Sequence, residues 1–90
     1  MKVYIVIEQY KNNSYDYYCK YIKDVFATRD GAEKYIFSYD MNRDSDQCDE
    51  DIWYEDEVKP DSDIVRSFYK SSEYGEESTD FKIIEREIVE

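Results

Sequence analysis

Residues 2–10 read KVYIVIEQY and alternate between the two faces of an extended chain. One face carries three aliphatic residues, and the other mixes aromatic, aliphatic and acidic ones: Val3, Ile5 and Ile7 against Tyr4, Val6, Glu8 and Tyr10. Because successive side chains of a β-strand point to opposite sides, this period of two predicts a strand.

Turn-forming residues follow this strand directly. Residues 11–14 (KNNS) include two asparagines, which tolerate positive φ and hydrogen-bond to their own backbone. A second β-rich segment covers residues 15–26, so the two segments predict a hairpin. Large rings lie on both faces of the second segment, which leaves its register open. Asp24, before Val25, marks a candidate bulge.

Residues 29–41 have the pattern of an amphipathic helix. Thr28 is a candidate N-cap, and Asp30 lies where the helix dipole favours negative charge. An apolar stripe recurs at helical spacing: Ala32, Tyr35, Ile36 and Tyr39. Gly31 costs the first turn about 1 kcal/mol relative to alanine, but good helix formers follow it.

A last strand is predicted at residues 80–89, which are rich in β-branched residues. Before it, residues 62–72 form either a short helix capped by Ser62 or a strand, and residues 71–79 form a polar loop. The last strand pairs with the hairpin while the helix covers one face. This predicts an α+β fold with a two-layer β-β-α-β core and an antiparallel sheet.

One domain is expected, because 90 residues support a single core. Its β-β-α part occupies residues 1–41, and an acidic insertion at residues 40–63 precedes the last strand. That insertion contains eleven acidic and two basic residues, out of a total of 23 acidic and 12 basic residues. A net charge of −11 opposes direct binding to nucleic acid or to anionic membranes. A basic surface on another protein is the expected counterpart.

The chain is expected to be cytoplasmic. No apolar run approaches the roughly 18 residues that span a bilayer, and the first residues meet a charge too early for a signal peptide. An intracellular chain would keep Cys19 and Cys48 reduced, so both are interpreted as packing residues.

Aromatic residues lie inside the acidic insertion. In one interpretation its carboxylates stand in for phosphates and steer a basic groove, while Trp53 and Tyr54 anchor the contact. In the other, the insertion is a solvated loop, and Trp53 and Ile52 fill the core. The candidate partner-binding residues are the acidic and aromatic ones: Asp44, Asp46, Asp49, Glu50, Asp51, Trp53, Tyr54, Glu55, Asp56 and Glu57.

The same segment partly matches a calcium-binding loop. Asp44, Asp46 and Glu55 fall at the first, third and twelfth positions of the template. Asp49 occupies the position that requires glycine, and Cys48 replaces an oxygen ligand. No metal site is therefore expected.

The composition argues against an enzyme. The chain has no His, which removes the usual general base and most zinc sites. Only two glycines, Gly31 and Gly75, are present, so a glycine-rich phosphate loop is impossible. Neither catalytic residues nor a cofactor are expected.

Four short motifs resemble a group of small uncharacterised phage and prophage proteins: VYIV (residues 3–6), DVFAT (24–28), AEKYI (32–36) and IIEREI (83–88). Proteins of that group share a strand, a "gVFsT" step, an "AekyI" helix and a closing strand. The resemblance covers roughly half of the chain and implies the same fold. The acidic insertion departs from the short form of the group.

Small acidic phage proteins often block restriction enzymes, CRISPR effectors, DNA glycosylases or other host DNA-binding proteins by imitating DNA. The resemblance therefore implies an inhibitor in the host cytosol that binds a defence protein or a nucleic-acid-binding protein. Two alternatives remain open. One is a structural or regulatory homodimer joined through an edge strand or the tyrosine-rich sheet face. The other is a sensor that binds a small ligand between helix and sheet.

Overall fold

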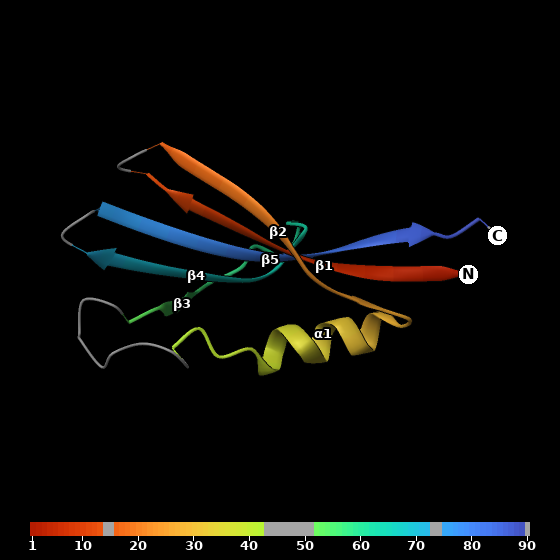
Figure 1. Ribbon diagram of the computed structural model, residues 1–90. Coiled ribbons are helices and arrows are strands. Elements are labelled where there is room, and N and C mark those ends of the chain that lie inside the picture. Colours follow the sequence, from red (N-terminus) through yellow and green to blue (C-terminus); the bar gives the residue numbers. More distant parts are fainter. Residues whose placement is uncertain (14–15, 43–51, 73–74, 90) are drawn as a thin grey trace.

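A computed structural model describes residues 1–13, 16–42, 52–72 and 75–89 (Figure 1). This part of the chain contains five strands and one helix. In chain order they are β1 (Lys2–Asn12), β2 (Tyr17–Phe26), α1 (Arg29–Ser38), β3 (Tyr54–Asp56), β4 (Ile64–Ser72) and β5 (Gly75–Glu87).

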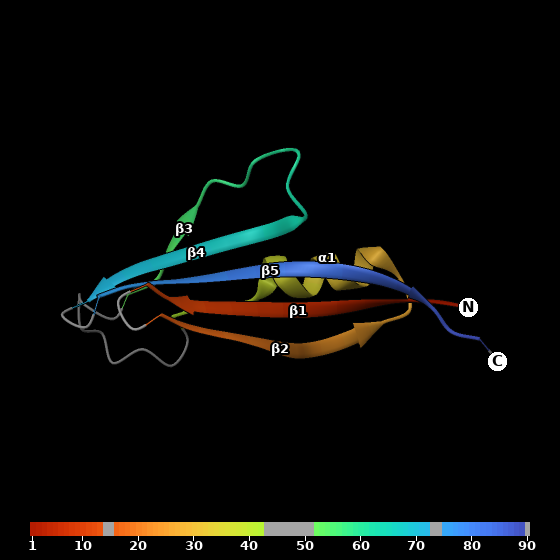
Figure 2. The same cartoon turned by 90° about the horizontal axis from the view of Figure 1, so that it is seen from above.

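The strands form one antiparallel sheet in the order β2-β1-β5-β4-β3. Helix α1 lies along one face and contacts β1, β2, β4 and β5 (Figures 1 and 2). The predicted α+β class, with an antiparallel sheet and one main helix, is confirmed. The predicted β-β-α-β order is incomplete, because β3 and β4 lie between the helix and the last strand.

Strands β1 and β5 are neighbours in the sheet, paired from Lys2 opposite Glu87 to Asn12 opposite Glu77. The β1–β2 hairpin and the β4–β5 hairpin flank this pair on either side. Strands β2 and β3 lie at opposite ends of the sheet, and α1 lies between them in the sequence. The chain therefore crosses the sheet from one outer strand to the other through the helix.

The core lies between α1 and the sheet. Its buried apolar side chains come from the helix and three strands: Val6, Ala32, Ile36, Phe68 and Phe81. Burial of each of the larger side chains, the valine, the isoleucine and the two phenylalanines, stabilises the fold by about 1.5–3 kcal/mol. In β1 the buried Val6 shares its face with Tyr4, so the face of Val3, Ile5 and Ile7 points away from the helix.

Helix α1 has a side-chain cap at its start. Thr28 Oγ1 accepts a hydrogen bond from Gly31 N at 3.1 Å, which confirms the predicted N-cap. The predicted apolar stripe packs against the core through two buried and two half-buried side chains: Ala32, Ile36, Tyr35 and Tyr39. The helix ends at Ser38 rather than at residue 41, because Tyr39 is extended, with φ −71° and ψ 127°.

The middle of the chain differs from the prediction. Residues 64–72 form β4, so the helix alternative is wrong there and the strand alternative is correct. The polar loop predicted at residues 71–79 is also wrong, because β5 begins at Gly75 and not at residue 80. Polar side chains remain in this hairpin, which extends past the end of α1 (Figure 1), because some pair across its strands, as Lys70 Nζ does with Glu77 Oε2 at 3.3 Å, and others are exposed, as Glu76 is.

The predicted β1–β2 hairpin is confirmed, with a bulge close to the predicted position. Val6 pairs with Asp24 and Ile7 pairs with Ile22, which leaves Lys23 as the extra residue. The Asp24 carboxylate accepts a hydrogen bond from the next backbone N–H at 2.8 Å. Cys19 in β2 is a half-buried free thiol, whereas Cys48 lies outside the described residues.

Candidate functional site

The acidic segment reaches the sheet at β3, the edge strand beyond β4. Figure 2 shows the loop that follows, residues 57–63, standing out beside β4. Half of the predicted partner-binding residues belong to this described part: Trp53, Tyr54, Glu55, Asp56 and Glu57. The others lie outside the described residues: Asp44, Asp46, Asp49, Glu50 and Asp51.

Trp53 is held by contacts to its side chain and to its backbone. The half-buried indole packs against the core, and Lys70 Nζ lies 4.9 Å from the ring centroid. The amide of Asn42 brackets the Trp53 backbone. Its Oδ1 accepts from Trp53 N at 2.8 Å, and its Nδ2 donates to Trp53 O at 3.1 Å. This packing favours the interpretation that Trp53 fills the core, and its contact with a partner stays a prediction.

Glu55 forms an ion pair within the protein. Its Oε1 accepts hydrogen bonds from Arg66 Nη2 at 2.9 Å and from Arg66 Nε at 3.1 Å. Arg66 Nη1 donates to three carbonyl oxygens at the end of α1, at 2.8, 3.2 and 3.1 Å: those of Ile36, Phe37 and Tyr39. The last carbonyls of a helix lack partners within the helix and favour a nearby cation. Arg66 therefore connects β3, β4 and α1.

The remaining residues of the edge face solvent. The side chain of Tyr54 is 51% exposed, and its ring centroid lies 5.9 Å from that of Tyr69 in the neighbouring strand. Asp56 and Glu57 are exposed, and Asp56 Oδ1 accepts a hydrogen bond from Glu57 N at 2.8 Å. Two further exposed carboxylates follow in the loop: Asp61 and Asp63. We call residues 54–57 with Asp61 and Asp63 the acidic edge. It combines exposed carboxylates with the Tyr54–Tyr69 ring pair.

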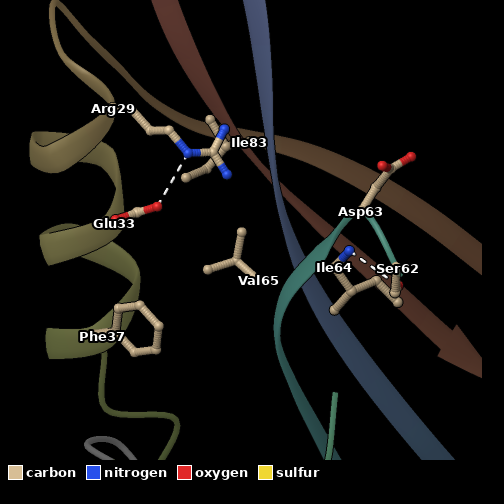
Figure 3. A pocket seen from close by; sticks show the side chains of 8 residues that line it. All are labelled: Arg29, Glu33, Phe37, Ser62, Asp63, Ile64, Val65 and Ile83. Atoms are coloured by element: carbon tan, nitrogen blue, oxygen red, sulfur yellow. Dashed lines mark hydrogen bonds and ion pairs between the residues drawn. The ribbon is translucent and has the colours of Figure 1, made fainter. Parts of the chain in front are cut away.

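A groove of about 520 Å³ lies between α1 and the start of β4 (Figure 3). It is lined by apolar side chains and by charged or polar ones: Phe37, Ile64, Val65 and Ile83, with Arg29, Glu33, Ser62 and Asp63. Arg29 Nε donates to Glu33 Oε1 at 3.1 Å on the helix side. The groove is open to solvent, and its exposed lining is more polar than apolar.

Three side chains position the acidic edge although the sequence analysis assigns them no role: Asn42, Arg66 and Lys70. Arg66 did carry a signal, because it is a charged residue inside the apolar run of residues 64–69. Asn42 carried none, since its contact with Trp53 depends on how the chain folds back after α1.

Across the described residues, no group of three or more Cys, Asp and Glu side chains is arranged to hold a metal ion. Within that same part of the chain, no helix has the length and apolar character that a bilayer crossing requires. Comparison with protein-family models, with curated proteins and with solved structures found no match for this chain. A functional assignment therefore depends on the residues and the geometry described above.

Proposed function

We propose that this protein is an acidic inhibitor of the phage type that binds a host defence or nucleic-acid-binding protein through its β3 edge. The observation that carries this proposal is a set of exposed carboxylates on an edge strand that the rest of the fold holds in place. Asp56 and Glu57 face solvent there, while Glu55 and Trp53 attach the edge to the helix and to β4. In this mechanism the carboxylates occupy phosphate positions on a basic groove.

The distribution of charge along the sequence supports binding of a basic partner at the β3 edge. Residues 1–39 carry six basic and five acidic groups, so nearly all of the net charge arises after the helix. Interactions between exposed charges are screened beyond about 8 Å at physiological ionic strength. A local concentration of carboxylates therefore steers a basic partner to one edge, and the complex must weaken as salt increases.

The aromatic pair at the edge supports a contact with some apolar area. Tyr54 and Tyr69 are 51% and 46% exposed, and they stack loosely across β3 and β4. Tyrosine is enriched among the residues that contribute most to protein–protein binding, because it combines a large ring with a polar end. Such a pair supplies affinity that salt cannot remove.

The test uses a charge-reversal variant with a matched control. Asp56→Lys/Glu57→Lys changes two exposed acids of the edge, whereas Glu76→Lys/Glu87→Lys changes two exposed acids of β5 by the same net charge. Glu55 is left unchanged because it binds Arg66. A third variant reverses Asp49, Glu50 and Asp51. Each protein serves as bait in lysate of a bacterial host, at low and high salt, with duplex DNA as competitor.

The expected result is a nucleic-acid-binding protein that wild type and the β5 variant retain, that the edge variants lose, and that duplex DNA displaces. If the Asp56→Lys/Glu57→Lys variant retains the same protein as wild type, the edge is not the binding surface. If duplex DNA fails to displace the captured protein, the contact is not DNA mimicry.

The groove of Figure 3 favours a second candidate, a sensor for a small amphipathic ligand between helix and sheet. Val65→Trp would fill this space next to Phe37. A screen of small apolar carboxylates and amines, read by thermal shift, should find ligands that stabilise wild type and not the Val65→Trp variant. Equal shifts in both proteins would place the ligand elsewhere.

A further inference from the structure

The face of the sheet opposite α1 has no covering layer among the described residues. Its side chains follow from the strand register, because directly paired residues point to the same side. Val25 pairs with Ile5, which pairs with Ile84, and in the next row Ile22 pairs with Ile7. We call this surface the open face. On β1, β2, β4 and β5 it is defined by these residues: Val3, Ile5, Ile7, Gln9 and Lys11 of β1, Tyr18, Lys20, Ile22 and Val25 of β2, Glu76, Ser78, Asp80, Lys82, Ile84 and Arg86 of β5, and Ile64, Ser67, Tyr69 and Ser71 of β4.

One end of the open face is an aliphatic block. Three of its rows contain seven aliphatic side chains from four strands: Val3, Ile5, Ile7, Ile22, Val25, Ile64 and Ile84. Ile22 is 70% exposed and Val25 is 50% exposed. A contiguous apolar patch of this kind marks an interaction site on a soluble protein.

The charge of the open face selects the partner. On these four strands the open face carries four basic and two acidic groups: Lys11, Lys20, Lys82 and Arg86 against Glu76 and Asp80. Asp56 of the outer strand β3 lies on the same side, because it pairs with Ser67. The whole chain carries −11, so two copies repel each other through most of their surfaces. The open face is the part of the sheet through which two copies can approach without opposing excess negative charge.

We propose that a second copy of this chain packs on the open face, with the two-fold axis running along the sheet between β1 and β5. This axis places β1 over β5 of the second copy and β2 over its β4, in the aligned packing of a β-sandwich. Ile5 then faces Ile84, and Ile22 faces Ile64. The register excludes direct opposition of like charges, because Lys82 and Arg86 face Ile7 and Val3 and can lay their aliphatic stems across them.

The size of the face suits such a dimer. Four strands spaced about 4.8 Å apart, over nine residues of about 3.4 Å each, span roughly 600 Å² in plan. A standard stable interface buries about 800 Å² of accessible surface per partner. The proposed interface is therefore smaller than a standard one. Strand β3 lies outside the overlap, so its carboxylates stay accessible in both copies, whereas Tyr69 of β4 faces Tyr18 of the second copy.

The test depends on a pairing that a single chain cannot make. Ile22 and Ile64 lie on β2 and β4, with β1 and β5 between them, so they cannot touch within one sheet. Ile22→Lys and Ile64→Glu each place a charge in the aliphatic block. Each variant alone should dissociate at least about tenfold more readily than wild type in sedimentation equilibrium, because a charge then faces isoleucine.

Mixing the Ile22→Lys and Ile64→Glu variants should restore association, since the introduced ammonium group of one protein then faces the introduced carboxylate of the other. Phe37→Glu, an exposed apolar residue on the helix side, is the matched control and should leave association unchanged. Circular dichroism confirms that each variant is folded.

The proposal is overturned if wild type remains monomeric up to about 1 mM, the weak limit of specific association. It is equally overturned if Phe37→Glu dissociates the dimer as strongly as Ile22→Lys, or if the mixture of the Ile22→Lys and Ile64→Glu variants associates no better than either variant alone. Should one variant fail to fold, the concentration dependence of wild type and the Phe37→Glu control still decide between these outcomes.

Discussion

The guanidinium group of Arg66 contacts the acidic edge and the end of the helix at the same time. It is mostly buried, with 16% of its side chain exposed, and it lies 4.6 Å from the Phe68 ring centroid. Five hydrogen bonds leave it, two to Glu55 and three to carbonyls at the end of α1. The planar guanidinium group can donate to Glu55 and to the helix carbonyls at the same time, whereas a lysine ammonium group cannot reach both.

Arg66→Met should therefore lower the free energy of unfolding by about 2–3 kcal/mol, because the charge-assisted bonds to Glu55 and to the carbonyls at the end of α1 are lost. Arg66→Lys should recover only part of this loss. Arg29→Met is the control, since its exposed pair with Glu33 is worth a few tenths of a kcal/mol. Urea denaturation measures all three, and equal losses for the Arg66→Met and Arg29→Met variants would contradict a special role for Arg66.

Asn42 is expected to fix the position of Trp53. Asn42→Ala removes both amide bonds to the Trp53 backbone and should destabilise the fold by about 1–3 kcal/mol. It should also shift the Trp53 emission to longer wavelength as the ring loosens. Asn13→Ala, at an exposed position, is the control. An unchanged emission spectrum in Asn42→Ala would show that core packing alone holds the indole.

Cys19 lies between Tyr17 and Tyr21 on the same face of β2. Hydrogen bonding from Tyr21, and then from Tyr17, lowers the pKa of the Cys19 thiol, and the same contact raises the pKa of Tyr21 to about 12. A lowered pKa means that the thiolate forms at lower pH. In a Cys48→Ser background, Tyr21→Phe should therefore move the pH midpoint of Cys19 alkylation upward. Conversely, Cys19→Ser should bring the Tyr21 titration, read by ultraviolet absorbance, back toward about 10. A midpoint that does not move in Tyr21→Phe would exclude the phenol as the cause.

Among the elements, helix α1 has two opposing requirements at position 31 of its first turn: helix propensity favours alanine there, and the Thr28 cap needs the space that glycine leaves. A Cβ added at Gly31 would lie 3.2 Å from Thr28 Oγ1, the atom that caps the helix, and 3.4 Å from Phe26 Cδ1. Glycine thus leaves room for the cap but lowers the helix propensity by about 1 kcal/mol relative to alanine.

Thr28→Ala should cost about 1 kcal/mol through loss of the cap. Gly31→Ala should be close to neutral in wild type, yet stabilise the Thr28→Ala variant by roughly 0.5–1 kcal/mol, because the crowding oxygen is then gone. Thermal unfolding of the four proteins measures this coupling. Strict additivity would mean that the contact between Thr28 and position 31 carries no strain.

The elements with local signals could be predicted from the sequence. Alternation in residues 2–10 and the stripe of α1 report their own periods, and the Thr28 cap is a local contact. Strand β3 could not be found this way, because three residues show no period and its pairing with β4 depends on the rest of the sheet. The start of β5 was missed for a similar reason, since its polar residues remain in a ladder that extends past the helix.

The candidate site was predictable in composition and not in geometry. The aromatic and acidic character of residues 53–57 indicated an edge of interest. That Glu55 would pair inward with Arg66 depends on a contact eleven residues away, and the bond from Arg66 to Ile36 spans thirty. No sequence period encodes such contacts.

For the whole molecule, the sheet order predicts a gradient of local stability. Strands β1 and β5 are paired on both sides, while β2 and β3 are the outer strands of the sheet that the described residues form. Amide hydrogen exchange should therefore be slowest at Val6 and Phe81, which are also fully buried, and fastest in β3. A β3 that exchanges as slowly as β1 in a dilute monomeric sample would contradict this order.

The bulge at Lys23 changes the edge that β2 would present to another strand. Its ammonium group turns inward, 3.1 Å from Glu8 and 5.4 Å from the Tyr39 ring centroid. A regular ten-residue edge strand with several tyrosines would offer a continuous template on which further chains could add, as in amyloid growth. The extra residue interrupts that template within β2, and another strand that straightened the edge would leave the inward Lys23 charge without its partner. We therefore expect Lys23 to oppose the addition of further strands at the β2 edge.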